Sequence, residues 1–402
     1  MKYQSVLEHI AAYWPRLIRH TPTDEGTLIG LPQPYLVPSE NPIFRELFYW
    51  DSYFTALGLL ETLLEDHIVG ITENLAYLYK RFGVIPNGSR YYFLSRSQPP
   101  FFTRLVQLAL QVKEGRGDAD TLEWLRDMTA VSMNEHETVW MGTEHPHPRQ
   151  MHRGLSRYFD INYLDVLASC ESGWDHSTRC DSRWLEHLPV DLNSILYARE
   201  LDIADAHVAL GNPEAARLWR GKAETRAGTM NELMWDEAAG FYFDYDFAAE
   251  RRNPHPSLAG FYPLWAGLAT PERAARAVTE WLPRFSQQGG LLTTIEVQTG
   301  RQWAAPNGWV PLHWLVVAGL ERYGFHAEAT RIMRAWCDNN AAVFENTGAL
   351  WEKYNVTQIG VEGEGGLYGS LRGFGWTNGV FADFARRLEA MELKAEGERR
   401  LE

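Results

Sequence analysis

The chain has 402 residues, of which 45% are hydrophobic and 22% are charged, and its formal net charge at pH 7 is −14. This composition supports a sizeable packed core, and the negative charge disfavours binding to phosphate backbones, so we expect no nucleic-acid partner. No stretch of about 18 apolar residues occurs, so we also expect no contact with a membrane interior.

The three cysteines, Cys170, Cys180 and Cys337, form neither an even disulfide framework nor a metal-ligand spacing. The first residues, MKYQSVLEHIAAYW, have the pattern of an amphipathic helix and lack the unbroken apolar run of a signal peptide. We therefore expect reduced thiols in a cytoplasmic protein, and these features predict no particular oligomeric state.

Five successive pairs of segments have apolar residues at spacings of three and four, the pattern of amphipathic helices. These pairs cover residues 51–83, 100–141, 194–224, 257–281 and 309–336. In three of them the second segment begins alike, as GNPEAARLW, ATPERAARAV and GFHAEATRIM. Pro is tolerated at the first helical position, Glu suits the positive helix end, and Asn212 or Thr270 can cap the free amides.

The three similar starts lie about one helix pair apart, a spacing that is typical of repeat architectures. We predict an all-α fold in which about six helical hairpins close into a double-layered (α/α)6 barrel, with long functional loops and a few short β-hairpins. An open solenoid of the same hairpins is the alternative. The composition shows no linker, so we predict a single catalytic domain over residues 1–402.

The stretches between the predicted helices are rich in Gly, Pro and aromatic residues, and long loops in a compact domain usually carry function. They are residues 84–100, 141–160, 171–190, 238–256, 286–309 and 345–375. In one of them Asp244 and Asp246 alternate along FYFDYDF, which predicts a β-hairpin at the rim.

Several loops combine a Trp with an acid or Arg and with amide or hydroxyl groups. They contain FRELFYWDSY (44–53), IPNGSRYYFLSRSQPPFF (85–102), ESGWDHSTR (171–179), RQWAAPNGWVP (301–311), WEKYNV (351–356) and GGLYGSLRGFGWTNGVF (365–381). A sugar needs such a set, because its apolar face stacks on aromatic rings while its hydroxyls bind planar polar groups. Trp50 and Asp51 either bind a polar, ring-shaped ligand or form the buried start of a core helix. Asn307 and Gly308 belong to the same site or form only a turn.

Hydrolysis of a glycoside needs two carboxyl groups, one acting as a protonated acid and the other as a base or nucleophile. Asp175 and Glu352 are candidates, because each follows a Trp within a loop. A Trp wall can desolvate the Asp175 carboxyl and raise its pKa. The alternative for Asp175 is a turn with a capping Asp.

Two other polar clusters have simpler interpretations. His145, His147 and His152 lack a helical ligand spacing and lie in a Pro-rich stretch, so we expect no metal there. Glu362 and Glu364 match only part of a calcium-loop series, which favours a solvated acidic loop.

Taken in order, these motifs resemble those of the trehalase family, glycoside hydrolase family thirty-seven, and of its relatives on the same six-hairpin barrel. FRELFYWDSY is similar to a family signature of the form G-G-R-F-x-E-x-Y-x-W-D-x-Y, with Phe48 in place of its first Tyr. QWAAPNGWVP is similar to a second signature, Q-W-D-x-P-N-G-W-x-P. The similar segments extend from about residue 40 to residue 385.

The resemblance implies an inverting α-glycosidase that hydrolyses a small α-linked disaccharide or glucoside, above all α,α-trehalose to glucose, without a cofactor. It places Asp175 at the general-acid position and Glu352 at the general-base position. It further implies a sugar-binding set made up of Phe44, Tyr49, Trp50, Asp51, Asn87, Arg96, Gln98, Trp174, Arg179, Gln302, Trp303, Asn307, Trp309 and Trp376.

Three positions depart from the family pattern, since Ile43 stands for an Arg, Ala304 for an Asp and Leu367 for a Glu. The Arg-containing segment ahead of the acid is replaced by HPHPRQMHRGLSRYFD. These changes leave the two catalytic carboxyls in place and concern the pocket for the leaving group.

Two further hypotheses follow from these departures. A hydrolase of mannosylglycerate or glucosylglycerate, like those of family sixty-three, would use Arg149, Arg153, Arg157 or Arg372 to bind a carboxylate. A protein that binds a sugar without hydrolysing it is the third hypothesis, although the presence of both carboxyls argues against it.

Overall fold

The structure, a computed structural model, describes residues 2–142, 148–175, 177, 179–296, 300–366 and 369–401. These residues form thirteen α-helices: α1 (Gln4–Leu17), α2 (Tyr49–Leu57), α3 (Asp66–Phe82), α4 (Phe102–Arg116), α5 (Thr121–Glu135), α6 (Asp165–Glu171), α7 (Val190–Ala209), α8 (Pro213–Leu233), α9 (Tyr262–Ala266), α10 (Pro271–Phe285), α11 (Val310–Arg322), α12 (His326–Thr347) and α13 (Gly375–Leu401). Shorter helical turns are η1 (Tyr91–Ser95), η2 (His136–Met141), η3 (Arg179–Ser182), η4 (Trp184–Glu186) and η5 (Leu258–Phe261).

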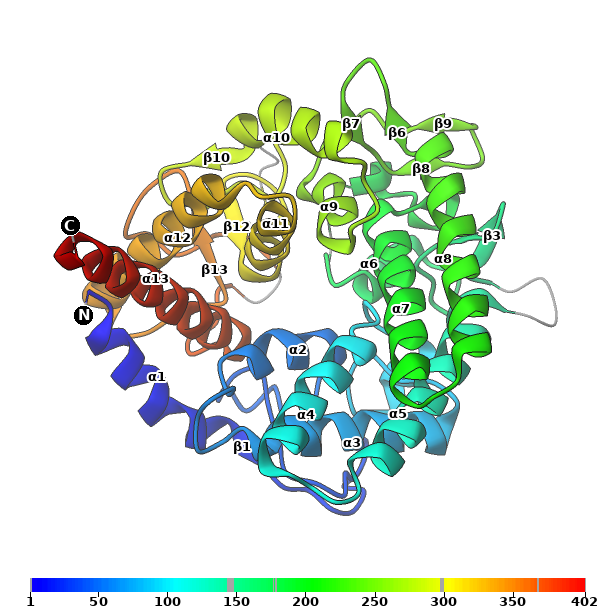
Figure 1. The fold of residues 1–402 in the computed structure, drawn as a ribbon, viewed down its shortest axis with the longest axis horizontal. Helices are drawn as coiled ribbons and strands as arrows, with labels where there is room; N and C mark the ends of the chain where they lie inside the picture. Colours follow the sequence, from blue (N-terminus) through cyan, green and yellow to red (C-terminus); the bar gives the residue numbers. More distant parts are fainter. Residues whose placement is uncertain are drawn as a thin grey trace.

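The long helices form two concentric layers (Figure 1). The inner ring consists of α2, α4, α7, α9, α11 and α13, each of which packs against the next. The contact between α13 and α2 closes the ring, so the predicted barrel is confirmed and the open solenoid is excluded. The outer helices α1, α3, α5, α8, α10 and α12 alternate with the inner ones along the chain, which makes six helix pairs.

Burial distinguishes the two layers. All nine residues of α2 are buried, and a helix that is buried all round belongs in the interior. The buried residues of α8 instead recur at spacings of three and four, as Ala216, Trp219, Ala223, Arg226 and Met230 show. The outer helix therefore turns one stripe toward the ring, as its apolar spacing predicts.

The start of α10 shows why the Thr-Pro-Glu pattern begins a helix. The hydroxyl of Thr270 accepts a hydrogen bond from the amide of Arg273 at 3.3 Å, and Pro271 occupies the first turn. The helix α8 likewise begins at Pro213, but the side chain of Asn212 makes no capping hydrogen bond. The capping prediction is confirmed for Thr270 and wrong for Asn212.

Short antiparallel strands occupy the connections between helices. The pairs are β1 (Ile18–Arg19) with β2 (Tyr35–Leu36), β3 (Gln150–His152) with β4 (Leu155–Ser156), β6 (Trp235–Asp236) with β7 (Phe241–Tyr242), and β10 (Ser286–Gln287) with β11 (Gly290–Leu291). In addition, β8 (Tyr245–Asp246) lies between β5 (His187–Leu188) and β9 (Arg251–Arg252), and β12 (Asn307–Trp309) pairs with β13 (Lys353–Asn355). The hairpin predicted around Asp244 and Asp246 is present as β8 and β9.

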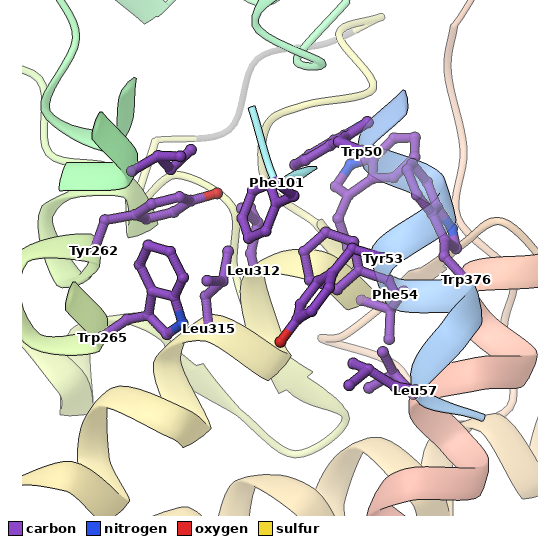
Figure 2. Close-up of a cluster of buried hydrophobic side chains, with 14 of the residues drawn as sticks. Trp50, Tyr53, Phe54, Leu57, Phe101, Tyr262, Trp265, Leu312, Leu315 and Trp376 are labelled. Carbon is purple, nitrogen blue, oxygen red and sulfur yellow. The ribbon is translucent and has the colours of Figure 1, made fainter. Parts of the chain in front are cut away.

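An aromatic cluster fills the interior of the ring (Figure 2). The ring of Phe101, which is fully buried, lies 5.2 Å from that of Tyr53, 5.3 Å from that of Phe54 and 5.6 Å from that of Trp265. These partners belong to α2 and α9, while Phe101 itself lies just before α4. The cluster therefore ties three inner elements together, and Trp50 lies at its edge, 5.7 Å from Phe54.

The substitution Phe101→Ala should lower the free energy of unfolding by roughly 3–5 kcal/mol, because it leaves a cavity among rings that cannot collapse into it. Urea denaturation followed by tryptophan fluorescence measures the change. The matched control is Leu63→Ala, since the Leu63 side chain is 103% exposed. A loss for Phe101→Ala no larger than the control's would show that the cluster does not hold the ring.

Candidate active site

One cavity collects residues from each group of motifs. It is lined by Pro38, Phe44, Phe48, Trp50, Asp51, Gln98, Gly173, Asp175, Gln302, Trp303, Trp309, Glu352, Phe374 and Trp376. Three carboxyl groups, those of Asp51, Asp175 and Glu352, thus share a space whose other walls are aromatic rings and two amide side chains. Catalysis on a sugar requires this combination of stacking surfaces, amides and acids.

The first turn of α2 brings the first two motifs together. The amide N–H of Trp50 donates to Oε1 of Gln98 at 3.1 Å, and the Gln98 side chain also hydrogen-bonds the Asp51 carboxyl. Trp50 and Asp51 therefore lie in the first turn of a buried helix and line the cavity at the same time. The helix interpretation is confirmed, and the binding of a sugar ring remains a prediction.

Four tryptophans form one wall of the cavity. The rings of Trp303 and Trp309 stack at 3.9 Å with their planes 4° apart, and Trp50 lies 6.1 Å from Trp303. Trp376 stands edge-on to Trp309 at 5.8 Å. Such flat, rigid faces suit the apolar side of a sugar ring.

The strand pair β12–β13 brings Glu352 to this wall. Trp309 lies opposite Lys353 in the ladder, which places Glu352 beside the tryptophans although the two segments are far apart in sequence. The Glu352 amide donates to the Leu371 carbonyl at 2.8 Å, and its carbonyl accepts from Nε1 of Trp376 at 3.2 Å. The backbone of Glu352 is therefore held from both sides.

Gly173 allows Asp175 to reach the cavity. Its φ is +74°, and a Cβ at this position would approach Cζ2 of Trp50 to 2.6 Å. A residue with a side chain would thus be strained and would collide with the tryptophan. Gly173 therefore allows the loop to pass close to Trp50, and Asp175, two residues later, reaches the cavity.

Burial changes the acidity of two of the carboxyls. It raises the pKa of Asp51 to about 8, helped by the nearby Asp175 and Glu352 carboxylates. Burial also raises the pKa of Asp175 to about 7, where the charge of Arg96 opposes the increase and that of Glu352 adds to it. A carboxyl that keeps its proton near neutral pH can act as a general acid.

Two predicted sugar-binding residues lie outside the cavity wall. The hydroxyl of Tyr49 donates to Glu135 at 2.9 Å inside the barrel core, because its side chain leaves α2 on another side than that of Trp50. The side-chain amide of Asn87 donates to the carbonyls of Ser97 and Cys170, both at 3.3 Å. We correct both predictions, since these groups hold the scaffold instead of facing the cavity.

Three further residues of the predicted set support the wall from behind. Trp174 stacks on Trp303 at 5.4 Å with an angle of 19° between the planes. Arg179 lies 4.6 Å above the Trp174 ring and is fully engaged by Asp191 and Asp244, at 2.7 and 2.6 Å from its Nη2. Two protein carboxylates therefore bind the Arg179 guanidinium, and Arg179 is not part of the wall of this cavity.

Arg96 completes that supporting layer. Its guanidinium pairs with Asp160 at 3.2 Å, so it acts on Asp175 by charge and does not line the cavity. Asn307 donates to the carbonyls of Gln302 and Glu364 at 3.0 and 2.7 Å. Asn307 and Gly308 belong to strand β12, so the turn interpretation is wrong, and the Asn307 amide is already used by two backbone carbonyls.

The four arginines considered as carboxylate ligands all bind protein groups. Arg149 forms a buried pair with Glu171, and Arg153 pairs with Glu232 at 2.5 Å. The side chains of Arg157 and Arg372 donate to backbone carbonyls. None of the four belongs to the cavity wall. Leu367, His145 and His147 lie outside the described residues.

The sequence analysis missed several residues that complete the site. Pro38, Phe48 and Phe374 line the cavity, and Lys353 places its ammonium 3.1 Å from Oε2 of Glu352. The signal for Lys353 was its position directly after Glu352 in the motif WEKYNV. Pro38 carried no such signal.

Another cavity lies between η2, α7 and α8, and it offers no free acid. Its two carboxylates, Glu137 and Glu200, are paired with Lys222 at 2.6 Å and with Arg226 at 2.8 Å. Among the described residues, no group of three His, Cys, Asp or Glu side chains is placed to hold a metal ion. No described helix has both the length and the apolar character needed to cross a membrane.

Buried carboxyls in a tryptophan-lined cavity of a closed (α/α)6 barrel are the groups that a glycoside hydrolase needs. The family model described as trehalase matches residues 1–165 and 159–389, so the chain belongs to the trehalase family and the predicted resemblance is confirmed. Periplasmic trehalases of Escherichia coli strains are 35% identical over 422 aligned residues, which cover 94% of this chain and 73% of theirs. Their name gives no support to the expected cytoplasmic location.

Solved structures agree with this assignment. The neutral trehalase of Saccharomyces cerevisiae matches with a TM-score of 0.77 and 29% identity, covering 92% of this chain and 76% of the yeast chain. A mannosylglycerate hydrolase of family sixty-three from Thermus thermophilus matches with a TM-score of 0.70, covering 94% of this chain and 100% of that chain. Its 19% identity shows a shared fold only.

We predict that Gly173→Ala lowers kcat/KM for glycoside hydrolysis at least tenfold, because displacement of a binding group by about 1 Å can cost about a hundredfold. Steady-state kinetics measure the loss. Gly83→Ala is the matched control: its φ is +72° but a Cβ there meets nothing within 4 Å. Equal activities of the two variants would contradict the steric role of Gly173.

Proposed function

We propose that this protein hydrolyses α,α-trehalose to two molecules of glucose, with inversion at the carbon that water attacks. The observation that carries the proposal is that Asp175 and Glu352 face one cavity lined by stacked tryptophans. Membership of the trehalase family, and the names of the relatives above, support trehalose as the substrate.

Asp175 would serve as the general acid. Because burial raises its pKa to about 7, the carboxyl holds a proton in slightly acidic to neutral solution. It donates this proton to the glycosidic oxygen while the bond from that oxygen to the anomeric carbon breaks. The leaving glucose departs as a neutral alcohol and keeps its α configuration.

Glu352 would serve as the general base on the opposite side of the sugar. It accepts a proton from water as the water oxygen bonds to the anomeric carbon, which yields β-glucose from the attacked unit. Trp303 and Trp309 would stack on the ring, and the amides of Gln98 and Gln302 would bind its hydroxyls. Asp51, protonated near neutral pH, can donate as well as accept a hydrogen bond to the sugar.

Two further expectations remain predictions. We infer a single catalytic domain, because one hydrophobic cluster extends from Tyr3 to Leu388. A cytoplasmic location still rests on the cysteines, of which Cys180 and Cys337 are buried and unpaired. Cell fractionation with an antibody distinguishes it from the periplasmic location that the E. coli names state.

The test of the function is glucose release from trehalose, mannosylglycerate and glucosylglycerate in parallel. Trehalose should be turned over, and Asp175→Asn and Glu352→Gln should each lower kcat by about 10²–10⁴-fold. Proton NMR during the first turnovers should show α- and β-glucose in equal amounts. The control is Glu114→Gln, an exposed acid on α4. Turnover of a glycerate alone, or full activity of either carboxyl variant, would overturn the proposal.

A second prediction concerns pH. The acid works in its protonated form, so kcat/KM for trehalose should fall as the pH rises through about 7, the pKa of Asp175. Ionisation of Asp51, whose pKa is about 8, should steepen the decline. Initial rates between pH 5 and pH 9, each extrapolated to low substrate, measure the profile. A profile that stays flat to pH 9 would contradict the assignment of Asp175.

A further inference from the structure

Lys353 places a buried positive charge beside the candidate base. Its side chain is 0% exposed, and its Nζ lies 3.1 Å from Oε2 of Glu352. The same ammonium lies 3.4 Å from Oε1 of Gln302 and 3.2 Å from the carbonyl of Gly369. An ammonium has three N–H donors, so it can donate a hydrogen bond to each of these three oxygens.

The Lys353 side chain is buried against the tryptophan wall. Lys353 lies opposite Trp309 in the β12–β13 ladder, and its Nζ lies 5.3 Å from the centre of the Trp309 ring. The amide of Gly363 donates to the Lys353 carbonyl at 2.9 Å, which fastens the following loop over the strand. The charge is therefore held in one place, and water screens it little.

The cavity contains more carboxyls than it can keep ionised. Glu352 is faced by Asp51 from α2 and by Asp175 from the loop after α6, and the next residue, Lys353, begins strand β13. Arg96 acts on Asp175 by charge. Carboxylates that share a buried site cannot all ionise, so the position of the cations decides which of them carries the negative charge.

We propose that Lys353 is a positioning residue that makes Glu352 the ionised carboxylate of the cavity, so that Glu352 rather than Asp51 or Asp175 serves as the base. Through Gln302 the same ammonium orients an amide of the sugar-binding wall. The inference rests on the roles proposed for Glu352 and Asp175. It adds that the charge of Lys353 decides which of these carboxyls is ionised and serves as the base.

The test compares Lys353→Met, Lys353→Gln and Lys353→Arg by their pH profiles of kcat/KM for trehalose. Without the cation, Glu352 should take up a proton at higher pH, so the acid limb should move up by about one pH unit or more in the Met and Gln variants. The loss of kcat/KM in these two variants should therefore be larger at pH 5 than at pH 7. Lys353→Arg keeps the positive charge, so the acid limb of its pH profile should lie closer to that of the unchanged protein. The Gln variant retains hydrogen-bond donors, which keeps the test valid if the Met variant fails to fold.

Lys113→Met is the matched control. Lys113 is also a buried lysine, with Nζ 3.1 Å from Asp118 and 2.9 Å from Asp120, and it does not line the cavity. Its replacement should lower the melting temperature and leave the pH profile of kcat/KM unchanged. Comparison with this control therefore distinguishes a loss of stability, which lowers the melting temperature, from a change in the ionisation of the base, which shifts the pH profile.

The outcomes separate this inference from the proposed function. If Glu352→Gln is inactive but the acid limbs of Lys353→Met and Lys353→Gln stay in place, Lys353 does not select the base and the inference fails alone. If Glu352→Gln remains active, the proposed base itself is wrong and the inference fails with it. A shifted limb that Lys353→Arg restores supports the inference.

Discussion

The site depends on the backbone contact between α2 and α13, where the first and last inner helices meet. Gly379 packs against the carbonyl oxygen of Phe54, and a Cβ on Gly58 would come within 2.5 Å of the Gly379 Cα. A side chain at either glycine would push the helices apart and open the ring at its joint. The first turns of these helices carry Trp50 and Trp376, so ring closure also assembles the tryptophan wall.

The wall and the acids depend on each other. Tryptophan rings surround the buried carboxyls, and burial is the main reason why the pKa values of Asp51 and Asp175 are raised. Because the folded protein binds these protons more tightly than the unfolded chain, the two residues make folding less favourable as the pH rises from about 4 toward 7 or 8. At neutral pH the burial that keeps the acid protonated therefore also lowers the stability of the folded protein. The buried Lys353 offsets part of the negative charge that remains.

The helical pairs were predictable because local spacing specifies which face of a helix is apolar, as in α8 and α10. The presence of Asp175, Glu352 and most wall residues in one site was predictable from motifs in which Trp, acids and amides recur. Tyr49 and Asn307 were placed wrongly within those same motifs. Successive residues of a helix point about 100° apart, so Tyr49 enters the core while Trp50 enters the cavity. The amide of Asn307 binds the carbonyls of Gln302 and Glu364, and no local pattern shows that this amide is already used.

The sequence by itself determined the hairpin repeat, the family and the two carboxyls, because these are written in local spacing and in the order of short motifs. Only the tertiary structure decided that β12 pairs with β13, which carries Glu352 and Lys353 to the tryptophans. It also decided which carboxyls keep their protons. Burial and the placement of charges from distant segments control acidity, and neither is a property of residues that are adjacent along the chain.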